Sequence, residues 1–539
     1  MKSPFIRLLL IFTLLERVSL TQIPVFYKSK RWIGWLSIGS FLVLITNPAV
    51  GQERKEIRDS LYSSLLKETR MIEVLLPKSY RVGSAEKYGV VYKLDGEWDT
   101  WLLPGSYDFA VGAGFVPENI FVRIPNTYKN GVNLRDRDLT PSQVKEYSQL
   151  NELPISGGAD NFRAFLREEL IPYINKNYPS NGENTLVGGS LAGLFTIYTF
   201  LKDAHLFNSY VAVEPAMHWD NKYVNKLLTQ ELDNLSLLEN TTLWIAGREG
   251  RPYEYMGIAQ LDSILQKKAP KGLLWKSAAY PNETHYSAQY KGYYDGFKFI
   301  YSGYVNTIEY HPMNGILLKD QPITLVINTD TSALHYTTNG TIPTASSAKL
   351  TYSLPLSAPT QLRIQSFGHR SDYNKTISGH FIAGKVLAGR GKLKEGIAQG
   401  LHYSIFEGDW ETLPDYKQLT PVQSGKIQNK LEIKPFNQKT NHAFLIEGNM
   451  EVSTEGYYFF IIDSAHEVKV YVGNQLIIDG NGEKSNSKLS YVLPLGKGLH
   501  PLRVEVLQKK SGNKPNFKIY HQKKLQKKRE WWENEYLSF

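Results

Sequence analysis

Residues 184–201, NTLVGGSLAGLFTIYTFL, place one serine among small residues, between an apolar run and a second apolar run. The first run predicts a short strand and the second a helix, so Ser190 lies at the seam between them. Gly188 stands two positions before the serine and Ala192 two positions after it. Small neighbours of this kind permit the strained strand-to-helix turn that exposes a nucleophilic serine. They also suit close packing of a helix on a sheet. Other parts of the sequence are therefore needed to distinguish a nucleophile from a packing residue.

The surrounding region, residues 52–311, alternates between short β-rich runs and amphipathic helical runs. Helical spacing of apolar residues is clearest at 161–178 and 253–268. This alternation predicts a mostly parallel sheet with helices on both faces, whose ligands bind at the carboxyl ends of the strands. The expected strands cover residues 71–77, 88–96, 119–126, 184–189, 209–215, 241–247 and 273–281.

Composition narrows the chemistry. A length of 539 residues exceeds one ordinary domain, and 42% hydrophobic residues supply ample core material. The net charge of +10 comes partly from the basic runs YKSKR and HQKKLQKKREWW near the two ends. No nucleic-acid motif accompanies them, so we expect solvated tails and no nucleic-acid partner. The absence of cysteine excludes disulfides, thiolate metal sites and a cysteine nucleophile.

Residues 28–52, KSKRWIGWLSIGSFLVLITNPAVGQ, have a basic lead, an apolar stretch of about 14 residues and a small-residue end. This pattern is typical of a secretory signal with cleavage near Gly51. We therefore expect a periplasmic or secreted protein with no stable membrane insertion after cleavage. Residues 8–20 are also apolar, so membrane anchoring by the leader is the alternative.

Beyond about residue 312 the helical signal fades, and short β runs separated by Gly, Asn, Ser and Thr take over. The pattern predicts two all-β modules after the α/β domain, and so a multidomain chain. The expected division is a leader with signal peptide (1–51), the α/β domain (52–311), a small β-sandwich (312–385), a glycine- and lysine-rich linker (386–399), a second β domain (400–525) and a basic, aromatic tail (526–539).

A serine nucleophile needs a base to take its proton. In folds with this turn the order along the chain is serine, acid, histidine. His205, His218, His285 and His311 follow Ser190 within the α/β region. His285 stands in a polar loop after the last expected strand and before a helix, so it is the predicted general base.

The acid that orients the base is less determined by the sequence. Glu249, in the loop after the strand at 241–247, is our prediction. Three further carboxylates remain alternatives: Glu254, Glu283 and Asp220. Each could instead form a surface ion pair with Arg248 or Arg251. The backbone N–H of Leu191, at the start of the helix, is predicted to point at a developing oxyanion.

Several segments follow one another in the order and spacing of a known esterase family. They are VVYKLDGEWD (90–99), RIPNTYKNGVNLRDRDLTPS (123–142), GGADNFRAFLREELIPYINKNYP (157–179), LVGGSLAGLF (186–195), HLFNSYVAVEPAMHWDN (205–221) and NETHYS (282–287). Over roughly residues 60–305 the chain resembles the family that contains enterochelin esterase, esterase D and feruloyl or acetylxylan esterases.

The resemblance implies an α/β-hydrolase fold, Ser190 as nucleophile, His285 as base and a second oxyanion donor near Gly96 or Glu97. The family often has histidine before the serine and glycine two after it, where this chain has Gly189 and Ala192. It often has SPS before a tryptophan-rich run, where this chain has EPAMHWDN.

The β modules resemble known families too. LHYTTNGTIPT (334–344) resembles the small chitobiase/β-hexosaminidase C-terminal-type sandwich, and residues 400–416 with 453–480 resemble a PA14 domain. PA14 domains often accompany exported glycan-active enzymes, so the resemblance implies a carbohydrate setting and glycan binding by this domain. The alternative is that both modules are only spacers.

Together these features predict an exported serine carboxylic-ester hydrolase that removes acetyl or feruloyl groups from carbohydrates through an acyl-enzyme. Trp98 and Trp219 are the predicted substrate-stacking residues, with packing in the core or in a lid as the alternative role. No phosphate loop or metal-ligand spacing is present in the sequence, so we expect no cofactor and no metal. Two alternatives remain: an inactive carbohydrate-binding or scaffold protein, and a hydrolase of siderophore-type esters.

Overall fold

The computed structural model describes residues 54–98, 101–144, 156–235, 237–391, 400–427, 440–463, 467–480, 488–509, 516–521 and 535–538. The chain divides into two units, Met1–Glu53 and Arg54–Phe539. The expected leader and signal peptide lie outside the described residues, as do residues 392–399 of the expected linker. Within the described ranges, no helix is long and apolar enough to cross a bilayer.

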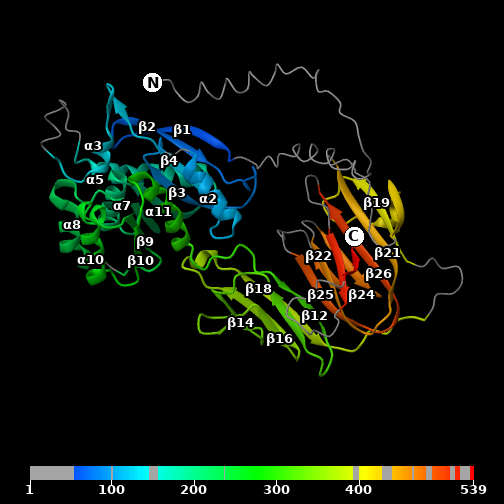
Figure 1. Cartoon of the computed structure of the whole chain (residues 1–539). Coiled ribbons are helices and arrows are strands. Elements are labelled where there is room, and N and C mark those ends of the chain that lie inside the picture. Colours follow the sequence, from blue (N-terminus) through cyan, green and yellow to red (C-terminus); the bar gives the residue numbers. More distant parts are fainter. Residues whose placement is uncertain are drawn as a thin grey trace, which may run out of the picture. The chain divides into compact units, whose positions relative to one another are not determined.

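The α/β region is built on one twisted sheet with the strand order β1-β2-β4-β3-β7-β8-β9-β10 (Figure 1). From β4 to β10 the neighbouring strands are parallel, whereas β1 and β2 add an antiparallel edge. The strands are β1 (Glu56–Ser63), β2 (Glu68–Leu75), β3 (Tyr88–Leu94), β4 (Asn119–Ile124), β7 (Ser180–Gly189), β8 (Ser209–Val213), β9 (Thr242–Arg248) and β10 (Leu274–Tyr280). The predicted mostly parallel sheet is confirmed, and β1 extends it by a strand that the sequence pattern did not reveal.

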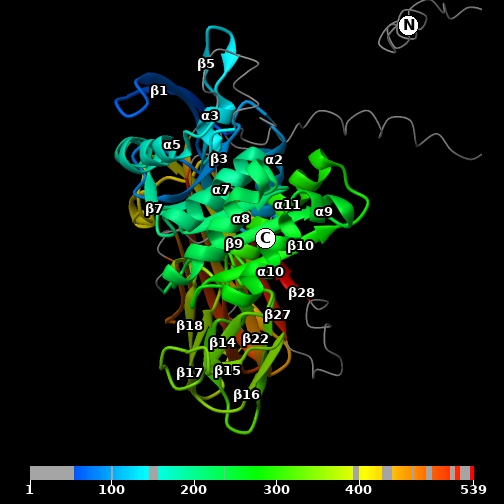
Figure 2. The same ribbon diagram turned by 90° about the vertical axis from the view of Figure 1, so that its left-hand side faces the viewer.

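Alternate residues of each central strand enter different cores, because successive side chains of a strand point to opposite faces. In β8, Tyr210 and Ala212 pack with helices from residues 159–177, 191–231 and 258–268, whereas Val211 and Val213 pack with the helices at 102–112 and 285–300. Figure 2 looks onto the first of these helical layers. Both faces are therefore covered, which explains why these strands read as continuous apolar runs.

The helices around the sheet have the following bounds: α2 (Leu102–Gly112), α3 (Arg135–Leu139), α5 (Ala159–Phe165), α6 (Ile171–Asn177), α7 (Leu191–Lys202), α8 (Trp219–Glu231), α9 (Arg251–Tyr255), α10 (Ile258–Lys268) and α11 (His285–Ile300). The helix expected at 161–178 is present but contains a π-helical turn, Leu166–Leu170, just before Pro172. Proline lacks the N–H that would continue the regular ladder, which accounts for the local change. The helix expected at 253–268 is interrupted at Gly257, where φ is 80°.

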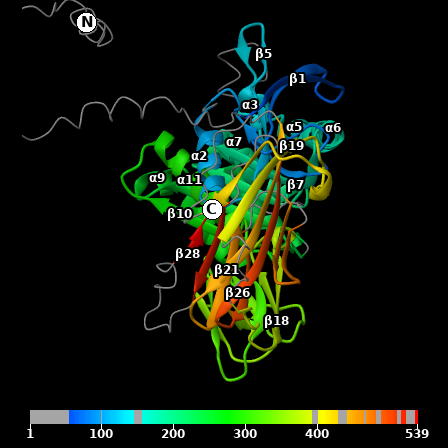
Figure 3. The same ribbon diagram turned by 90° about the vertical axis from the view of Figure 1, so that its right-hand side faces the viewer.

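The described residues after 309 form mostly β-sheets, as predicted. A small sheet has the order β11-β13-β16, and two larger sheets have the orders β15-β14-β17-β18-β12-β25-β22-β27-β28 and β20-β19-β21-β26-β23-β24. Figure 3 shows β19, β21 and β26 of the last sheet side by side. Asn314 of β12 pairs with Tyr491 of β25, so the two expected β modules share one sheet. The domain boundaries and the chitobiase-type resemblance stay predictions.

The bounds of these strands are β11 (Tyr310–His311), β12 (Asn314–Leu317), β13 (Ile323–Ile327), β14 (Leu334–Thr337), β15 (Ala348–Lys349), β16 (Ser353–Leu356), β17 (Thr360–Ser366), β18 (Thr376–Ala383), β19 (Gly400–Gly408), β20 (Gln423–Ile427), β21 (Asn441–Val452), β22 (Gly456–Asp463), β23 (Val468–Val472), β24 (Gln475–Gly480), β25 (Lys488–Leu495), β26 (Gly498–Gln508), β27 (Asn516–His521) and β28 (Glu535–Ser538).

Candidate active site

Ser190 occupies a strained turn between the end of β7 and the start of α7. Its φ is 57° and its ψ is −121°, a conformation that residues with a side chain rarely adopt. Holding a residue there costs about 1–3 kcal/mol, and such strain gathers at functional sites. The side chain is partly exposed, although the strand before it and the helix after it are buried.

The small residues around the serine serve the turn and the packing at once. A Cβ on Gly188 would lie 2.3 Å from the carbonyl oxygen of Ala192, and a Cβ on Gly193 would lie 3.0 Å from Cα of Pro215. Close packing therefore accounts for these two glycines. It does not account for the backbone angles of Ser190, which are the feature that a nucleophile requires.

His285 is the first residue of α11, directly after the loop that follows β10. The helix start is fixed by a capping box in which the Thr284 hydroxyl accepts the Ser287 N–H at 3.1 Å. Nδ1 of His285 lies 2.9 Å from Oε2 of Glu214. The Glu214 side chain is fully buried, whereas that of His285 is 32% exposed. With Nδ1–H donated to the carboxylate, Nε2 is left to accept a proton.

The carboxylate that orients His285 is therefore Glu214, and the prediction of Glu249 is wrong. The Glu249 backbone N–H donates to Tyr280, and its side chain is exposed. In the part of the chain that the structure describes, none of Asp220, Glu254 and Glu283 hydrogen-bonds the His285 ring either. Glu214 directly follows β8, the neighbour of β7, which brings the carboxylate beside the serine turn. The signal for it was a carboxylate immediately after a buried strand and between Ser190 and His285 in chain order.

Backbone contacts tie the serine turn to both sides of Glu214. The Ser190 N–H donates to the Val213 carbonyl at 3.1 Å, and the Ser190 carbonyl accepts the Ala216 N–H at 3.0 Å. Because these bonds join the carboxyl end of β7 to that of β8, Ser190 and the residue that binds the His285 ring lie at one edge of the sheet.

Helix α11 passes over the residue before the serine. A Cβ on Gly189 would lie 2.3 Å from Oε1 of Gln289 and 2.5 Å from the hydroxyl of Tyr293. Gln289 and Tyr293 follow His285 by four and eight residues, so all three share one face of the helix. The face of α11 that carries His285 therefore lies toward the serine turn, and Gly189 leaves room for it.

The electrostatics of Glu214 favour its ionised form. Burial by itself would raise its pKa, but hydrogen bonds from His285 and Arg248 outweigh burial and hold the pKa below its ordinary value. Arg248 donates through its backbone N–H to Oε1 at 2.5 Å and through Nε to Oε2 at 2.7 Å. A buried carboxylate that remains ionised can fix the imidazole and stabilise an imidazolium.

Gly96, one of the two predicted oxyanion donors in the β3–α2 loop, cannot serve as a donor. The Gly96 N–H donates to the Ile124 carbonyl at 3.0 Å, so it is not available to a substrate. A Cβ on Gly96 would lie 2.5 Å from the Ile124 nitrogen, which explains the glycine by packing alone. Within the described residues the Glu97 N–H has no backbone acceptor, and neither does the Leu191 N–H, the first of α7. These two remain the candidate donors.

Hydrogen bonds from Arg135 and Asn126 fix the loop that carries Glu97. Its neighbour Asp95 accepts two hydrogen bonds from the Arg135 guanidinium, both at 2.7 Å, and one from the Asn126 amide at 2.8 Å. The Glu97 carboxylate accepts the Asn126 backbone N–H at 3.1 Å. Arg135 also lies 4.8 Å from the centroid of the Trp98 ring. These contacts make the loop a rigid support for an N–H donor.

The two predicted stacking residues differ in exposure. Trp98 is 46% exposed, whereas Trp219 is 8% exposed and donates its Nε1–H to the Ser142 hydroxyl at 3.1 Å. Part of the Trp98 side chain is therefore exposed, whereas Trp219 is mainly a packing residue. Within the described residues, no group of three or more His, Asp or Glu side chains lies close enough to hold a metal ion.

The parallel sheet, the strained serine turn at a strand end and the histidine hydrogen-bonded to a buried carboxylate define a site of the α/β-hydrolase type. Comparison with known proteins agrees with this class. The family described as Putative esterase matches residues 63–297, and the PA14 domain matches residues 398–532. The α/β region thus matches this esterase family and the region after it matches the PA14 domain, in agreement with the sequence resemblance.

Curated relatives match only a segment. The ferri-bacillibactin esterase BesA of Bacillus subtilis is 34% identical over 97 residues, which is 17% of this chain and 34% of that protein. The siderophore enterobactin esterase of Emericella nidulans is 34% identical over 71 residues, which is 13% of this chain and 23% of that protein. The chain thus spans about a third or less of the length of these relatives.

Solved structures match over the α/β region. An IroE-like serine hydrolase from Shewanella oneidensis is 31% identical, with 46% of this chain and 79% of that chain covered and a TM-score of 0.40. The BES protein from Bacillus cereus is 26% identical, with 46% of this chain and 95% of that chain covered and a TM-score of 0.39.

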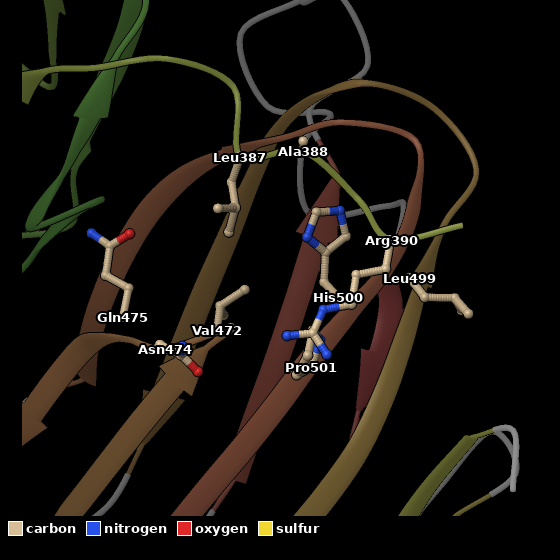
Figure 4. Close-up of a pocket in the computed structure, with 10 residues that line it drawn as sticks. Leu387, Ala388, Arg390, Val472, Asn474, Gln475, Leu499, His500 and Pro501 are labelled. Carbon is tan, nitrogen blue, oxygen red and sulfur yellow. The ribbon is translucent and has the colours of Figure 1, made fainter. Parts of the chain in front are cut away.

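A separate cavity lies in the β region (Figure 4). It has a volume of about 450 Å³ and is formed by the segment after β18, the β23–β24 turn and the start of β26. Its polar lining comes from Arg390, Asn474, Gln475 and His500, and its apolar lining includes Leu387. His500 is buried and donates Nε2–H to the Gly496 carbonyl at 2.8 Å. The cavity is large enough for a small polar ligand.

Proposed function

We propose that the chain is a serine carboxylic-ester hydrolase with Ser190 as nucleophile, His285 as base and Glu214 as orienting acid. The observation that carries the proposal is the hydrogen bond between His285 and the buried Glu214, at the sheet edge where Ser190 is held in a strained turn. A solvated surface histidine would not need a fully buried, ionised partner.

The arrangement supports acyl transfer in two steps. As Oγ of Ser190 attacks the ester carbonyl, its proton moves to Nε2 of His285, and Glu214 stabilises the imidazolium through Nδ1–H. Nε2 then gives the proton to the leaving alkoxide, so an alcohol departs and an acyl-enzyme remains. A water molecule loses a proton to Nε2 and attacks the acyl-enzyme, which releases the carboxylic acid and restores Ser190. The N–H groups of Leu191 and Glu97 are the proposed donors to the oxyanion of each tetrahedral intermediate.

The test is hydrolysis of p-nitrophenyl acetate by the purified chain and by Ser190→Ala. We expect the variant to lose nearly all of the rate, and a fluorophosphonate probe to modify Ser190 in the unaltered chain alone. Equal rates for the two proteins would overturn the proposal and favour an inactive scaffold.

For the substrate, we propose acetyl or feruloyl esters on carbohydrates. The PA14 domain supports a carbohydrate setting. Export through the signal pattern at 28–52 belongs to the same proposal, as does the periplasmic or secreted location. Sequencing the amino terminus of the protein recovered outside the cytoplasm checks the export step, because cleavage is expected near Gly51.

A second candidate substrate is a siderophore-type ester, which the names of the two curated relatives favour. The two candidates separate in one comparison. The kcat/KM for release of acetate or ferulate from xylan oligomers is measured beside that for cleavage of a catecholate triester, with Ser190→Ala as the blank in both. A preference of 100-fold or more for the triester would replace the carbohydrate proposal.

Glycan binding by the PA14 region is proposed at the cavity of Figure 4. The guanidinium of Arg390 and the amides of Asn474 and Gln475 are suitable partners for sugar hydroxyl or carboxylate groups. Affinity electrophoresis of Ser190→Ala in gels containing xylan or a uronate polymer tests it, with Asn474→Ala as the comparison. If the polymer changes the mobility of neither protein, the proposal of glycan binding fails and the domain is a spacer.

A further inference from the structure

Besides His285, the Glu214 carboxylate has a cationic partner, the Arg248 guanidinium. Arg248 is the last residue of β9, the strand next to β8, and it contacts both oxygens of the carboxylate. Nε of Arg248 and Nδ1 of His285 approach the same oxygen, Oε2, at 2.7 and 2.9 Å. The guanidinium is thus part of the site, whereas the sequence analysis considered Arg248 only as a possible partner in a surface ion pair.

This contact is specific. The Arg248 side chain is 26% exposed, and within the described residues Glu214 is the one carboxylate with which it forms an ion pair. Because the backbone N–H of the same residue also binds the carboxylate, the position of Glu214 is tied to the end of β9 at two points. Removal of the guanidinium would leave the carboxylate with the hydrogen bonds from the Arg248 backbone N–H and from His285, and so less firmly held.

Few other charged or titratable groups face the pair. From α9, Tyr253 packs beside Glu214 around Gly247, and from α11 the Tyr286 ring meets the His285 ring edge-on at 5.9 Å. In the loop before α11, Glu283 lies 3.8 Å from Lys291, so its charge is partly balanced. Arg248 is therefore the cation that directly contacts the Glu214–His285 pair in the described part of the chain.

We propose that Arg248 is a positioning residue of the esterase site, which keeps Glu214 ionised and correctly turned to hold the Nδ1 side of the His285 ring. The inference rests on the proposed function of Ser190 and His285. A nearby positive charge opposes the uptake of a further proton by the Glu214–His285 pair, whichever residue receives it. Since only the pair without that proton can accept the Ser190 proton, Arg248 extends activity toward lower pH.

The test is the pH profile of kcat/KM for p-nitrophenyl acetate with Arg248→Gln. We expect the acid limb to move up by about one pH unit and kcat at the optimum to fall about tenfold. Arg251→Gln is the matched control, because Arg251 carries the same charge three positions along the chain. Its side chain is exposed and, within the described residues, forms no hydrogen bond to the site. An acid limb of Arg248→Gln that coincides with that of the control would overturn the proposal.

A second variant separates charge from geometry. Arg248→Lys keeps the positive charge but loses the Nε donor, so the acid limb should stay near its original pH while kcat falls. If Arg248→Gln unfolds below the assay temperature, Arg248→Lys serves as the test instead. Unchanged kcat and unchanged profile in Arg248→Lys would contradict the positioning role.

A measurement without turnover distinguishes failure of this inference from failure of the esterase proposal. In Ser190→Ala protein with ¹⁵N-labelled histidine, the imidazole nitrogens of His285 report protonation of the pair directly. Adding Arg248→Gln should move this titration to higher pH by about one unit, even if no ester is hydrolysed. An unmoved titration in a folded double variant would overturn the inference alone.

Discussion

His285 Nδ1 and Glu214 Oε2 are 2.9 Å apart, although 71 residues separate them in the chain. The contact forms because the end of β8 lies beside the end of β7 and α11 starts directly above both. Glu214 itself has a φ of 49°, so its backbone, like that of Ser190, is held in an unfavourable conformation by its surroundings. Residues with strained backbones at two adjacent strand ends mark this edge of the sheet as the site.

Glu214→Gln should lower kcat for p-nitrophenyl acetate by about 10²–10⁴, because the amide no longer fixes the imidazole tautomer. Glu249→Gln should stay within about twofold of the unaltered chain, since Glu249 is exposed and does not contact His285. Steady-state kinetics on the two purified variants check this prediction. A larger loss in Glu249→Gln than in Glu214→Gln would reverse the assignment of the acid.

Ser190→Gly should unfold with a free energy about 1 kcal/mol higher than Ser190→Ala. Glycine relieves the strain at a φ of 57°, worth about 1–3 kcal/mol, but loses about 0.5–1 kcal/mol to its greater freedom in the unfolded chain. Urea denaturation of the two inactive variants measures the difference. If alanine proved the more stable residue, the turn would not be strained as described.

Gly189→Ala should lower both kcat and the free energy of unfolding, the latter by about 1–3 kcal/mol. The new methyl group would lie 2.3 Å from Gln289 Oε1 and push on the helix that carries His285. Adding Gln289→Ala should recover part of both losses, with Gln289→Ala alone as the control. Neither kcat nor the free energy of unfolding would recover if positions 189 and 289 were not in contact.

The stability of the chain should depend on pH through Glu214. Its folded pKa lies below the ordinary value of 4.5, so its contribution to stability is present above that value and is lost as pH falls through the lower folded pKa. Urea unfolding between about pH 3 and pH 7 should therefore show a smaller decline on the acid side in Glu214→Gln. Parallel curves for both proteins would contradict a depressed pKa.

The sequence by itself determined the elements that depend on local order and periodicity. The strand-to-helix seam at Ser190, the alternation of strands and helices, and the place of His285 after the last strand are all properties of neighbouring residues. The family resemblance added no contact between distant residues, but it named the same serine and histidine.

Only the tertiary structure decided which side chains meet. Glu214 was missed because the expected strand at 209–215 contained it, whereas β8 ends at Val213. The sequence of β8 also does not say which strands lie beside it. The N–H of Gly96 is used by Ile124 and Trp219 is buried, and both facts depend on packing between segments distant in sequence. Strand order and side-chain direction are set by the sum of many weak contacts across the fold, which no short stretch of the chain contains.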